Sequence, residues 1–350
     1  MRLNYQDGAE CAVLTAVDSK EMTDVPIRSC NGLALVLVLL LAFVCPGRAG
    51  QLPTLEPLLD AHTRLMVFSP HPDDETLGVG GLMQRVLEAG GKVRVVVMTN
   101  GDGFSEGVKQ EDHISHPTAT DYRKYGDERR VETLSAVAGL GVPKQDVVFL
   151  GFPDGGLRCL LWKVHADPQA YTSPFTQENR PPADEVLVPH TDYNARDLDT
   201  ELVREMSDFR PNLVAVTAPE DQHPDHAATY YFVKEALEDL EQRDPAIHPS
   251  MLTYLVHFGQ WPLGQEAGTG TRLNPPAHYP GQQTNWVSFS LQPAEAAAKR
   301  QAILRYDSQM LVMGRYLLSF ARANELYHLE APAGAQELAR ELAPIPCCWK

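Results

Sequence analysis

The sequence predicts an α/β fold in which a mostly parallel sheet lies between two layers of helices. One observation is that short apolar, strand-like segments alternate with longer helix-like segments through most of the chain, which is typical of repeated βα units. The other is that two clusters of His, Asp and Glu, at 71–75 and 220–226, each follow a strand-like segment. Open α/β sheets bind ligands at the carboxyl ends of their strands. We therefore expect a Rossmann-like three-layer sandwich with its active site at that end.

Apolar periodicity assigns the elements in turn, because short apolar runs are typical of buried strands and longer periodic stretches of helices. In chain order it predicts a strand at 65–68, a helix at 76–89, a strand at 93–98, a helix at 122–140, a strand at 147–150, a helix at 198–209, a strand at 213–216, a helix at 227–240, a strand at 252–258 and a helix or helix pair at 293–323. Proline is frequent in 158–194, and both proline and glycine are frequent in 259–285. We expect these stretches to be long loops that flank the active site and select the substrate.

The two acidic clusters have the composition of a metal site. The first reads His71-Pro-Asp-Asp-Glu, and the second ends in His-Pro-Asp-His226. A catalytic zinc usually takes three ligands from His, Asp and Glu and leaves a fourth position for water. His71, Asp74 and His226 are the candidate ligands. Acidic residues before a helix are more often caps, and a lone HxxH is more often a surface coincidence, but the two clusters together favour one shared site.

The remaining residues of the clusters have candidate catalytic roles. Asp73 is the candidate general base, because adjacent residues at a tight turn can direct one carboxylate to the metal and the other to the water. His223, if protonated, is expected to stabilise an oxyanion, with Asp225 holding its ring in the useful tautomer. The Gly-rich stretch 78–81 could be mistaken for a dinucleotide loop, but it lacks the full spacing, so helix packing is the better interpretation.

These motifs resemble the LmbE-like (PIG-L) N-acetylglucosaminyl deacetylases over about 65–325. The segments that carry the resemblance are 71–75, 76–81, 99–102, 129–132, 152–157 and 223–226. The resemblance implies zinc on His71, Asp74 and His226, Asp73 as general base and His223 as the group that steadies the tetrahedral intermediate. It also implies that Arg129 and Asp154 contact the sugar, although Arg130 lies directly beside the arginine so assigned.

The expected function is therefore that of a zinc-dependent hydrolase that removes acetyl from an N-acetylated amino sugar, in a small molecule or a glycan. One zinc per chain is expected, and Fe²⁺ is possible with the same ligand types. The alternatives are a zinc hydrolase of another amide or ester, and a non-catalytic, metal-stabilised carbohydrate-binding module. Asp73 discriminates between them, because a binding module has no use for a carboxylate beside the metal that is not a ligand.

The formal net charge of −16 argues against nucleic acid or anionic lipid as a partner. It also makes a polyanionic substrate less attractive, although a local basic pocket around Arg129 and Arg130 could accept one phosphate. No obligate protein partner is indicated, and the sequence leaves the oligomeric state open.

The amino-terminal segment is expected to be separate from the catalytic domain. Residues 33–45 are thirteen consecutive apolar residues, short for a membrane span of about 20 and typical of a secretory signal. Cleavage after Ala49 would leave a catalytic domain at 50–330 and a tail at 331–350, outside the cytoplasm in a secreted or periplasmic protein. The alternative is an uncleaved membrane anchor. In an exported protein Cys159 could pair with Cys347 or Cys348.

Overall fold

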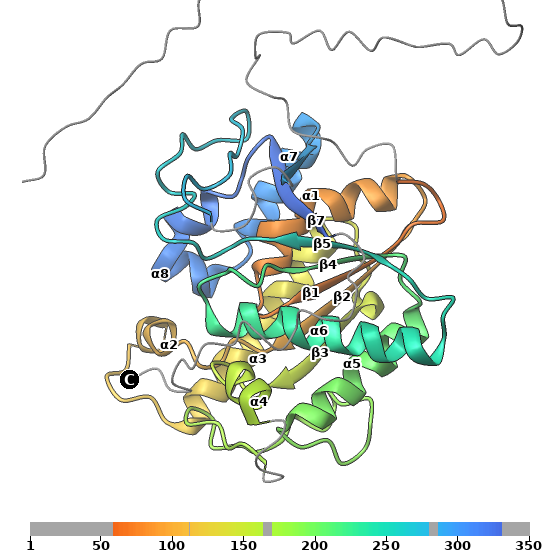
Figure 1. Cartoon of the computed structure of the whole chain (residues 1–350). Helices are drawn as coiled ribbons and strands as arrows, with labels where there is room; N and C mark the ends of the chain where they lie inside the picture. Colours follow the sequence, from red (N-terminus) through yellow and green to blue (C-terminus); the bar gives the residue numbers. More distant parts are fainter. Residues whose placement is uncertain (1–58, 112, 164–169, 280–285, 331–350) are drawn as a thin grey trace, which may run out of the picture. The chain divides into compact units, whose positions relative to one another are not determined.

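The computed structural model describes residues 59–111, 113–163, 170–279 and 286–330. Their strands form one seven-stranded sheet in the order β3-β2-β1-β4-β5-β7-β6 (Figure 1). The strands are β1 (Arg64–Ser69), β2 (Lys92–Thr99), β3 (Val147–Phe152), β4 (Leu213–Thr217), β5 (Ser250–Tyr254), β6 (Trp286–Ser290) and β7 (Asn324–Glu330). The pairs from β3 to β5 are parallel, whereas β7 is antiparallel to both β5 and β6. The predicted mostly parallel α/β sheet is confirmed.

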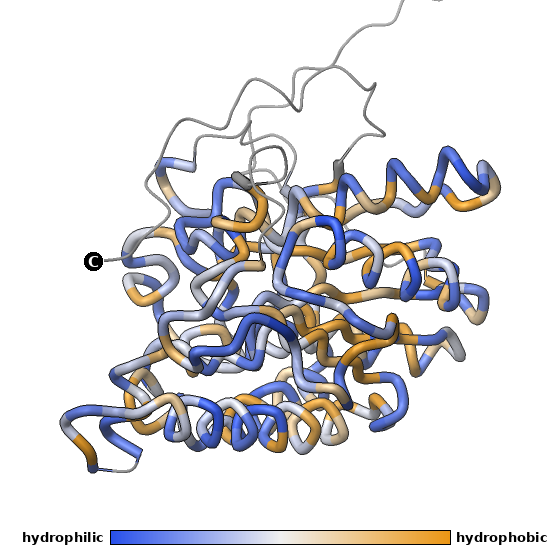
Figure 2. Tube along the Cα trace, turned by 90° about the horizontal axis from the view of Figure 1, so that it is seen from below, coloured by the Kyte–Doolittle hydropathy of each residue, from blue (hydrophilic) through white to orange (hydrophobic). Residues whose placement is uncertain are grey.

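Helices cover both faces of the sheet. They are α1 (Asp74–Glu88), α2 (Ser105–Glu111), α3 (Ala119–Gly139), α4 (Leu157–Lys163), α5 (Ala195–Phe209), α6 (Pro224–Arg243), α7 (Pro293–Ile303) and α8 (Asp307–Leu318). Alternate residues of β1 point to opposite faces. Leu65 and Val67 join a core with α1, α3 and α7, whereas Met66 and Phe68 join a second core with α4, α5 and α6. The apolar residues, orange in Figure 2, are concentrated between these layers, so the fold is a three-layer sandwich.

Three local expectations are wrong. Residues 158–163, expected to be loop, belong to α4, since the prolines of that stretch begin only at Pro168. The strand expected at 252–258 ends at Tyr254, and the segment after it enters the active site instead. The stretch 293–323 does contain two helices, α7 and α8, but β6 and β7 on either side of them were not predicted. Their antiparallel pairing joins segments distant in sequence, which local periodicity does not reveal.

The predictions for 1–49 and 331–350 fall outside the described residues, including any disulfide between Cys159 and the carboxyl-terminal cysteines. Cys159 itself is buried in α4. Within the described ranges, no helix combines the length and the hydropathy needed to cross a membrane.

Candidate active site

The two acidic clusters meet at the centre of one sheet edge. β1 and β4 are neighbours, with Leu65 paired to Leu213, and the cluster at 71–75 follows β1 while the cluster at 220–226 follows β4. Because the strand order reverses between β1 and β4, their carboxyl ends flank the crevice where open α/β sheets bind ligands. The topology therefore brings together residues that lie about 150 positions apart in the sequence.

The turn between β1 and α1 has an unusual backbone at Asp73. This residue has φ 111°, outside the regions that residues other than glycine normally adopt, and its carboxylate makes no capping hydrogen bond to α1. Its backbone N–H instead donates to Oε2 of the buried Glu75, at 3.2 Å. The hydroxyls of Ser69 and Tyr306 also donate to the Glu75 carboxylate. The interpretation of Asp73 as an ordinary helix cap is thereby excluded, and its side chain lines the cavity described below.

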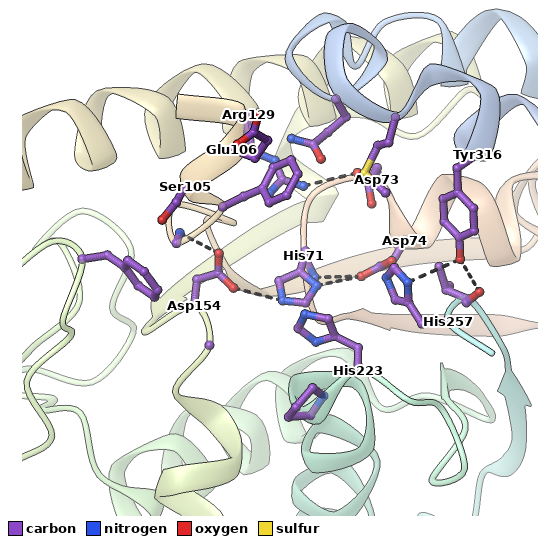
Figure 3. Close-up of a pocket in the computed structure, with 18 of the residues that line it drawn as sticks. His71, Asp73, Asp74, Ser105, Glu106, Arg129, Asp154, His223, His257 and Tyr316 are labelled. Carbon is purple, nitrogen blue, oxygen red and sulfur yellow. Dashed lines mark hydrogen bonds and ion pairs between the residues drawn. The ribbon is translucent and has the colours of Figure 1, made fainter. Parts of the chain in front are cut away.

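The donor atoms of the three expected metal ligands converge on one point. His71 Nδ1 lies 3.2 Å from Asp74 Oδ2 (Figure 3). His226 Nε2 lies 3.1 Å from each of these two atoms. We call these three atoms the donor triangle. All three side chains are buried. A tetrahedral ion about 2.1 Å from each ligand requires ligand atoms about 3.4 Å apart, so the triangle fits a zinc ion after shifts of a few tenths of an ångström.

The other ring nitrogen of each histidine faces carboxylates. His226 Nδ1 lies 3.2 Å from Asp221 Oδ2, and His71 Nε2 lies 3.1 Å from Asp154 Oδ1 and 3.3 Å from Asp225 Oδ2. Such carboxylates orient a ligating imidazole and keep its other nitrogen available for the metal. Although burial acts in the opposite direction, Asp221 and Asp74 raise the pKa of His226 to about 9. The surroundings of the triangle therefore favour a cation.

Other combinations of the same groups also bring possible ligand atoms within 4.8 Å of one another. They are His71 with His223 and His226, Asp74 with His226 and His257, and His71 with Asp154 and Asp225. Each combination shares a member of the donor triangle. In the last one the carboxylates accept backbone N–H groups, and in the donor triangle Asp74 Oδ2 likewise accepts the backbone N–H of His71 at 3.1 Å. The donor triangle is the candidate metal site that the sequence predicted.

Arg129, and not Arg130, is the arginine at the site. Its Nη1 donates to the carbonyl of Gly101 at 2.8 Å, and its Nη2 donates to the carbonyl of Pro72 at 2.7 Å and to Asp73 Oδ2 at 3.2 Å. Burial and the Asp74 carboxylate raise the pKa of Asp73, and Arg129 opposes that shift. The contact that the structure shows for Arg129 is thus with Asp73, and the expected contact with sugar stays a prediction.

Arg130 faces away from the active site. Its Nη1 lies 2.7 Å from Glu185 Oε1, and its guanidinium is close to Asp127 and Asp184. It is not among the residues that line the cavity. The expectation that both arginines form one basic pocket for a phosphate is therefore wrong.

The expected contact between the Asp225 carboxylate and the His223 ring is also absent. The Asp225 oxygens accept the N–H groups of Gly155 and Leu157, at 2.7 and 3.1 Å, and approach His71. It is the backbone N–H of Asp225 that donates to His223 Nδ1, at 3.3 Å. Burial and the neighbouring histidines lower the pKa of His223 well below its usual value. His223 is therefore a neutral ring with its proton on Nε2, a tautomer fixed by the helix start rather than by a carboxylate.

His257 is the functional candidate that sequence reasoning missed. Its ring lies 4.9 Å from that of His226 and stacks on Tyr316 with the two planes 12° apart. Asp221 Oδ2 accepts its backbone N–H at 2.9 Å. A polar residue directly after a strand would have pointed to the active-site edge of the sheet, as it did for the two clusters. The strand expected at 252–258 instead included His257 in its interior. The true end of β5 at Tyr254 places it at the carboxyl edge of the sheet with the two clusters.

A cavity of about 680 Å³ opens beside the donor triangle. His71, Asp73, Asp74, Arg129, Asp154, His223 and His257 line its polar part. The first of the two loops expected to select the substrate contributes Tyr171, Pro174 and Phe175, and α8 contributes Gln309, Met313, Tyr316 and Leu317. No described residue of the second loop, at 259–279, lines it. The cavity is large enough for a sugar with a substituent.

Comparison with known proteins connects this geometry to a chemistry. The family model described as GlcNAc-PI de-N-acetylase, PIG-L, matches residues 66–237. A 1D-myo-inositol 2-acetamido-2-deoxy-alpha-D-glucopyranoside deacetylase from Saccharopolyspora erythraea is 30% identical over 263 residues, which cover 72% of this chain and 79% of that protein. The enzyme of the same name from Mycobacterium sp. strain KMS is 28% identical over 192 residues, covering 54% of this chain and 55% of that protein.

Solved structures with a similar arrangement were also found. The N,N'-diacetylchitobiose deacetylase from Pyrococcus horikoshii has a TM-score of 0.46 at 16% identity, covering 76% of this chain and 83% of that one. The conserved protein TT1542 from Thermus thermophilus has a TM-score of 0.44 at 20% identity, covering 77% of this chain and 96% of that one.

Proposed function

We propose, on the premise that this chain belongs to the PIG-L family and is a deacetylase acting on an amide bond, that it removes the acetyl group from an N-acetylated amino sugar with the help of one bound zinc ion. Two imidazole nitrogens and one carboxylate oxygen suit zinc, and Fe²⁺ is the second candidate for the same ligands. The substrate is an amino sugar in a small molecule or a glycan, in line with the sugar substrate named for the Saccharopolyspora relative.

One observation carries the proposal. The donor triangle brings three groups with lone pairs within 3.1–3.2 Å of one another, while the adjacent carboxylate of Asp73 faces the same cavity with Arg129 as its partner. A purely structural metal site would have no need for a cavity or for a neighbouring buried carboxylate that is not a ligand. Amide hydrolysis needs both.

The residues divide the chemistry between them. Bound zinc supplies Lewis-acid chemistry, since it polarises a carbonyl and makes water more acidic. Asp73 takes the proton from the attacking water and returns it to the departing amine. His223 donates its Nε2–H to the oxyanion that develops on the acetamide. Arg129 holds the Asp73 carboxylate in place between these steps. Acetate and a free amino sugar leave.

The test is Asp73→Asn, which keeps the shape of the side chain and removes the proton acceptor. We expect this variant to retain metal and to lose a factor of about 10²–10⁴ in acetate release from N-acetylated sugars. Asp102→Asn is the matched control, because Asp102 follows β2 beside the site but does not line the cavity. Burial and Asp154 raise the pKa of Asp102, so the neutral amide imitates it. Equal activity of both variants would mean that another group activates the water.

We also propose that the protein acts outside the cytoplasm after cleavage of residues 1–49. Thirteen apolar residues reach only about 20 Å as a helix, against a hydrocarbon core of about 30 Å. Amino-terminal sequencing of the protein from its native host should find a start at or near Gly50. An intact amino terminus in the membrane fraction would support the anchor instead.

A further inference from the structure

Three aromatic side chains gather on one side of the cavity, next to Asp154. Phe104 lies directly before α2, and Tyr171 and Phe175 belong to the loop before α5. All three line the cavity and are half-buried. In Figure 3, Asp154 and Ser105 lie on one side of His71, and His257 and Tyr316 lie on the other. We call Phe104, Tyr171 and Phe175 the aromatic wall.

Glycines allow the aromatic wall to lie this close to Asp154. A Cβ atom on Gly103 would come within 2.8 Å of the Phe175 ring, and one on Gly156 within 2.9 Å of the Tyr171 ring. Gly103 also donates its N–H to Asp154 Oδ2 at 2.6 Å. The Phe175 ring therefore packs against the same turn that holds the carboxylate expected to bind the sugar.

Phe175 of the aromatic wall is held in place before any substrate binds. The Phe175 ring lies 5.3 Å from the ring of Tyr122 on α3. Arg123, the next residue of α3, donates to the carbonyl of Thr176 at 2.7 Å and to Glu178 at 3.1 Å. A rigid aromatic surface loses little entropy on binding, which favours stacking on a flat ligand.

The charges around the cavity disfavour an anionic group linked to the sugar. Four carboxylates line it, those of Asp73, Asp74, Glu106 and Asp154. Arg129 is the arginine among the described residues that line the cavity. Its Nη groups already donate to Asp73 and to two backbone carbonyls. Apart from the proposed zinc ion, a phosphate placed in this cavity would meet carboxylates rather than an available cation.

We propose that the aromatic wall is the subsite for the aglycone, and that the aglycone is uncharged and presents an apolar ring face. This inference rests on the proposed function, since it names the partner to which the N-acetylated sugar is linked. The sugar lies at Asp154 and the donor triangle, and its substituent stacks on Tyr171 and Phe175.

The experiment compares acetate release from three kinds of probe, namely p-nitrophenyl N-acetylglucosaminide in both anomers, free N-acetylglucosamine and N-acetylglucosamine 1-phosphate. We expect kcat/KM to be highest for an aryl glycoside and lowest for the phosphate. Phe175→Ala should lower the ratio of aryl-glycoside to free-sugar kcat/KM by about tenfold, and Phe175→Tyr should restore it. Tyr171→Ala gives an independent second variant.

Phe258→Ala is the matched control, because Phe258 is a half-buried aromatic residue beyond the lining of the cavity. It should leave the ratio unchanged. A phosphate preferred over the aryl glycoside would overturn the inference, and so would an equal loss on both neutral probes in Phe175→Ala. No turnover of any probe by the zinc-loaded protein would instead count against the proposed function itself.

Discussion

Glu185 lies in the loop before α5, and its titration predicts how the free energy of unfolding depends on pH. It is buried, with Oε1 2.7 Å from Arg130 Nη1 and Oε2 3.0 Å from Asn100 Nδ2. Burial raises its pKa from 4.5 to about 7, with Asp184 and Asp127 adding to the shift and Arg130 and Asn100 opposing it. The buried carboxyl group is thus more easily protonated in the folded chain than in the unfolded one.

The direction and size of this pH effect on stability follow from the linkage between protonation and folding. Because the folded pKa lies above the unfolded one, the contribution of Glu185 to stability is fully present below pH 4.5 and is lost as the pH rises through 7. A shift of this size corresponds to about 3 kcal/mol in total, of which roughly 2.5 kcal/mol is lost between pH 5 and pH 8. Glu185→Gln removes the titration. Its free energy of unfolding, relative to the natural protein, should therefore rise by that amount over the same interval.

The assay is denaturant unfolding of both proteins at several pH values from 5 to 8. Only the difference between them is used, because titrating groups that do not interact with Glu185 affect both proteins equally. Asp102 does interact with it, since Glu185 adds to the burial and the Asp154 charge that raise the pKa of Asp102, so both proteins carry Asp102→Asn. Glu178→Gln is the control on the same loop, since Glu178 is exposed and pairs with Arg123 at the surface. A difference for Glu185→Gln that stays constant across this pH range would refute the reasoning.

Three further outcomes are expected. His226→Ala should bind less than one metal ion per chain by metal analysis, because it removes one corner of the donor triangle, and unchanged metal content would contradict the ligand assignment. His223→Ala should keep its metal but lose a factor of about 10²–10³ in turnover, whereas a loss of metal would make His223 a ligand. Gly78→Ala should lower the free energy of unfolding by about 1–3 kcal/mol, because its Cβ would lie 2.2 Å from the buried Tyr254 ring. Gly139→Ala, whose nearest neighbour is a flexible arginine side chain at 3.5 Å, should be nearly neutral in the same denaturation assay.

Local sequence was enough for the strands and helices around the site. The segment at 65–68 is apolar at every position because β1 is covered on both faces, and the helices around it have long periodic stretches. The same local patterns placed both acidic clusters after strands. Since parallel strands end at one edge of the sheet, the sequence alone predicts that His71 and His226 meet there.

The sheet edge formed by β7 and β6 depends on tertiary structure. β6 and β7 pair with each other and β7 also pairs with β5, yet α7 and α8 lie between β6 and β7 in the chain. Strand pairing of this kind depends on partners distant in sequence, so neither strand could be recognised from its own residues. The position of His257 depends in the same way on where β5 stops pairing with β4.

Within the site, the sequence by itself determined which residue types are present and which end of the sheet they occupy. Only the tertiary structure decided where each polar group points. In the folded chain Arg129 contacts Asp73, whereas Arg130 contacts Glu185. The Asp225 carboxylate accepts backbone N–H groups and does not contact the His223 ring. The physical reason is that a buried polar group is satisfied by whichever partners the packing brings within about 3 Å, and that packing depends on the whole chain.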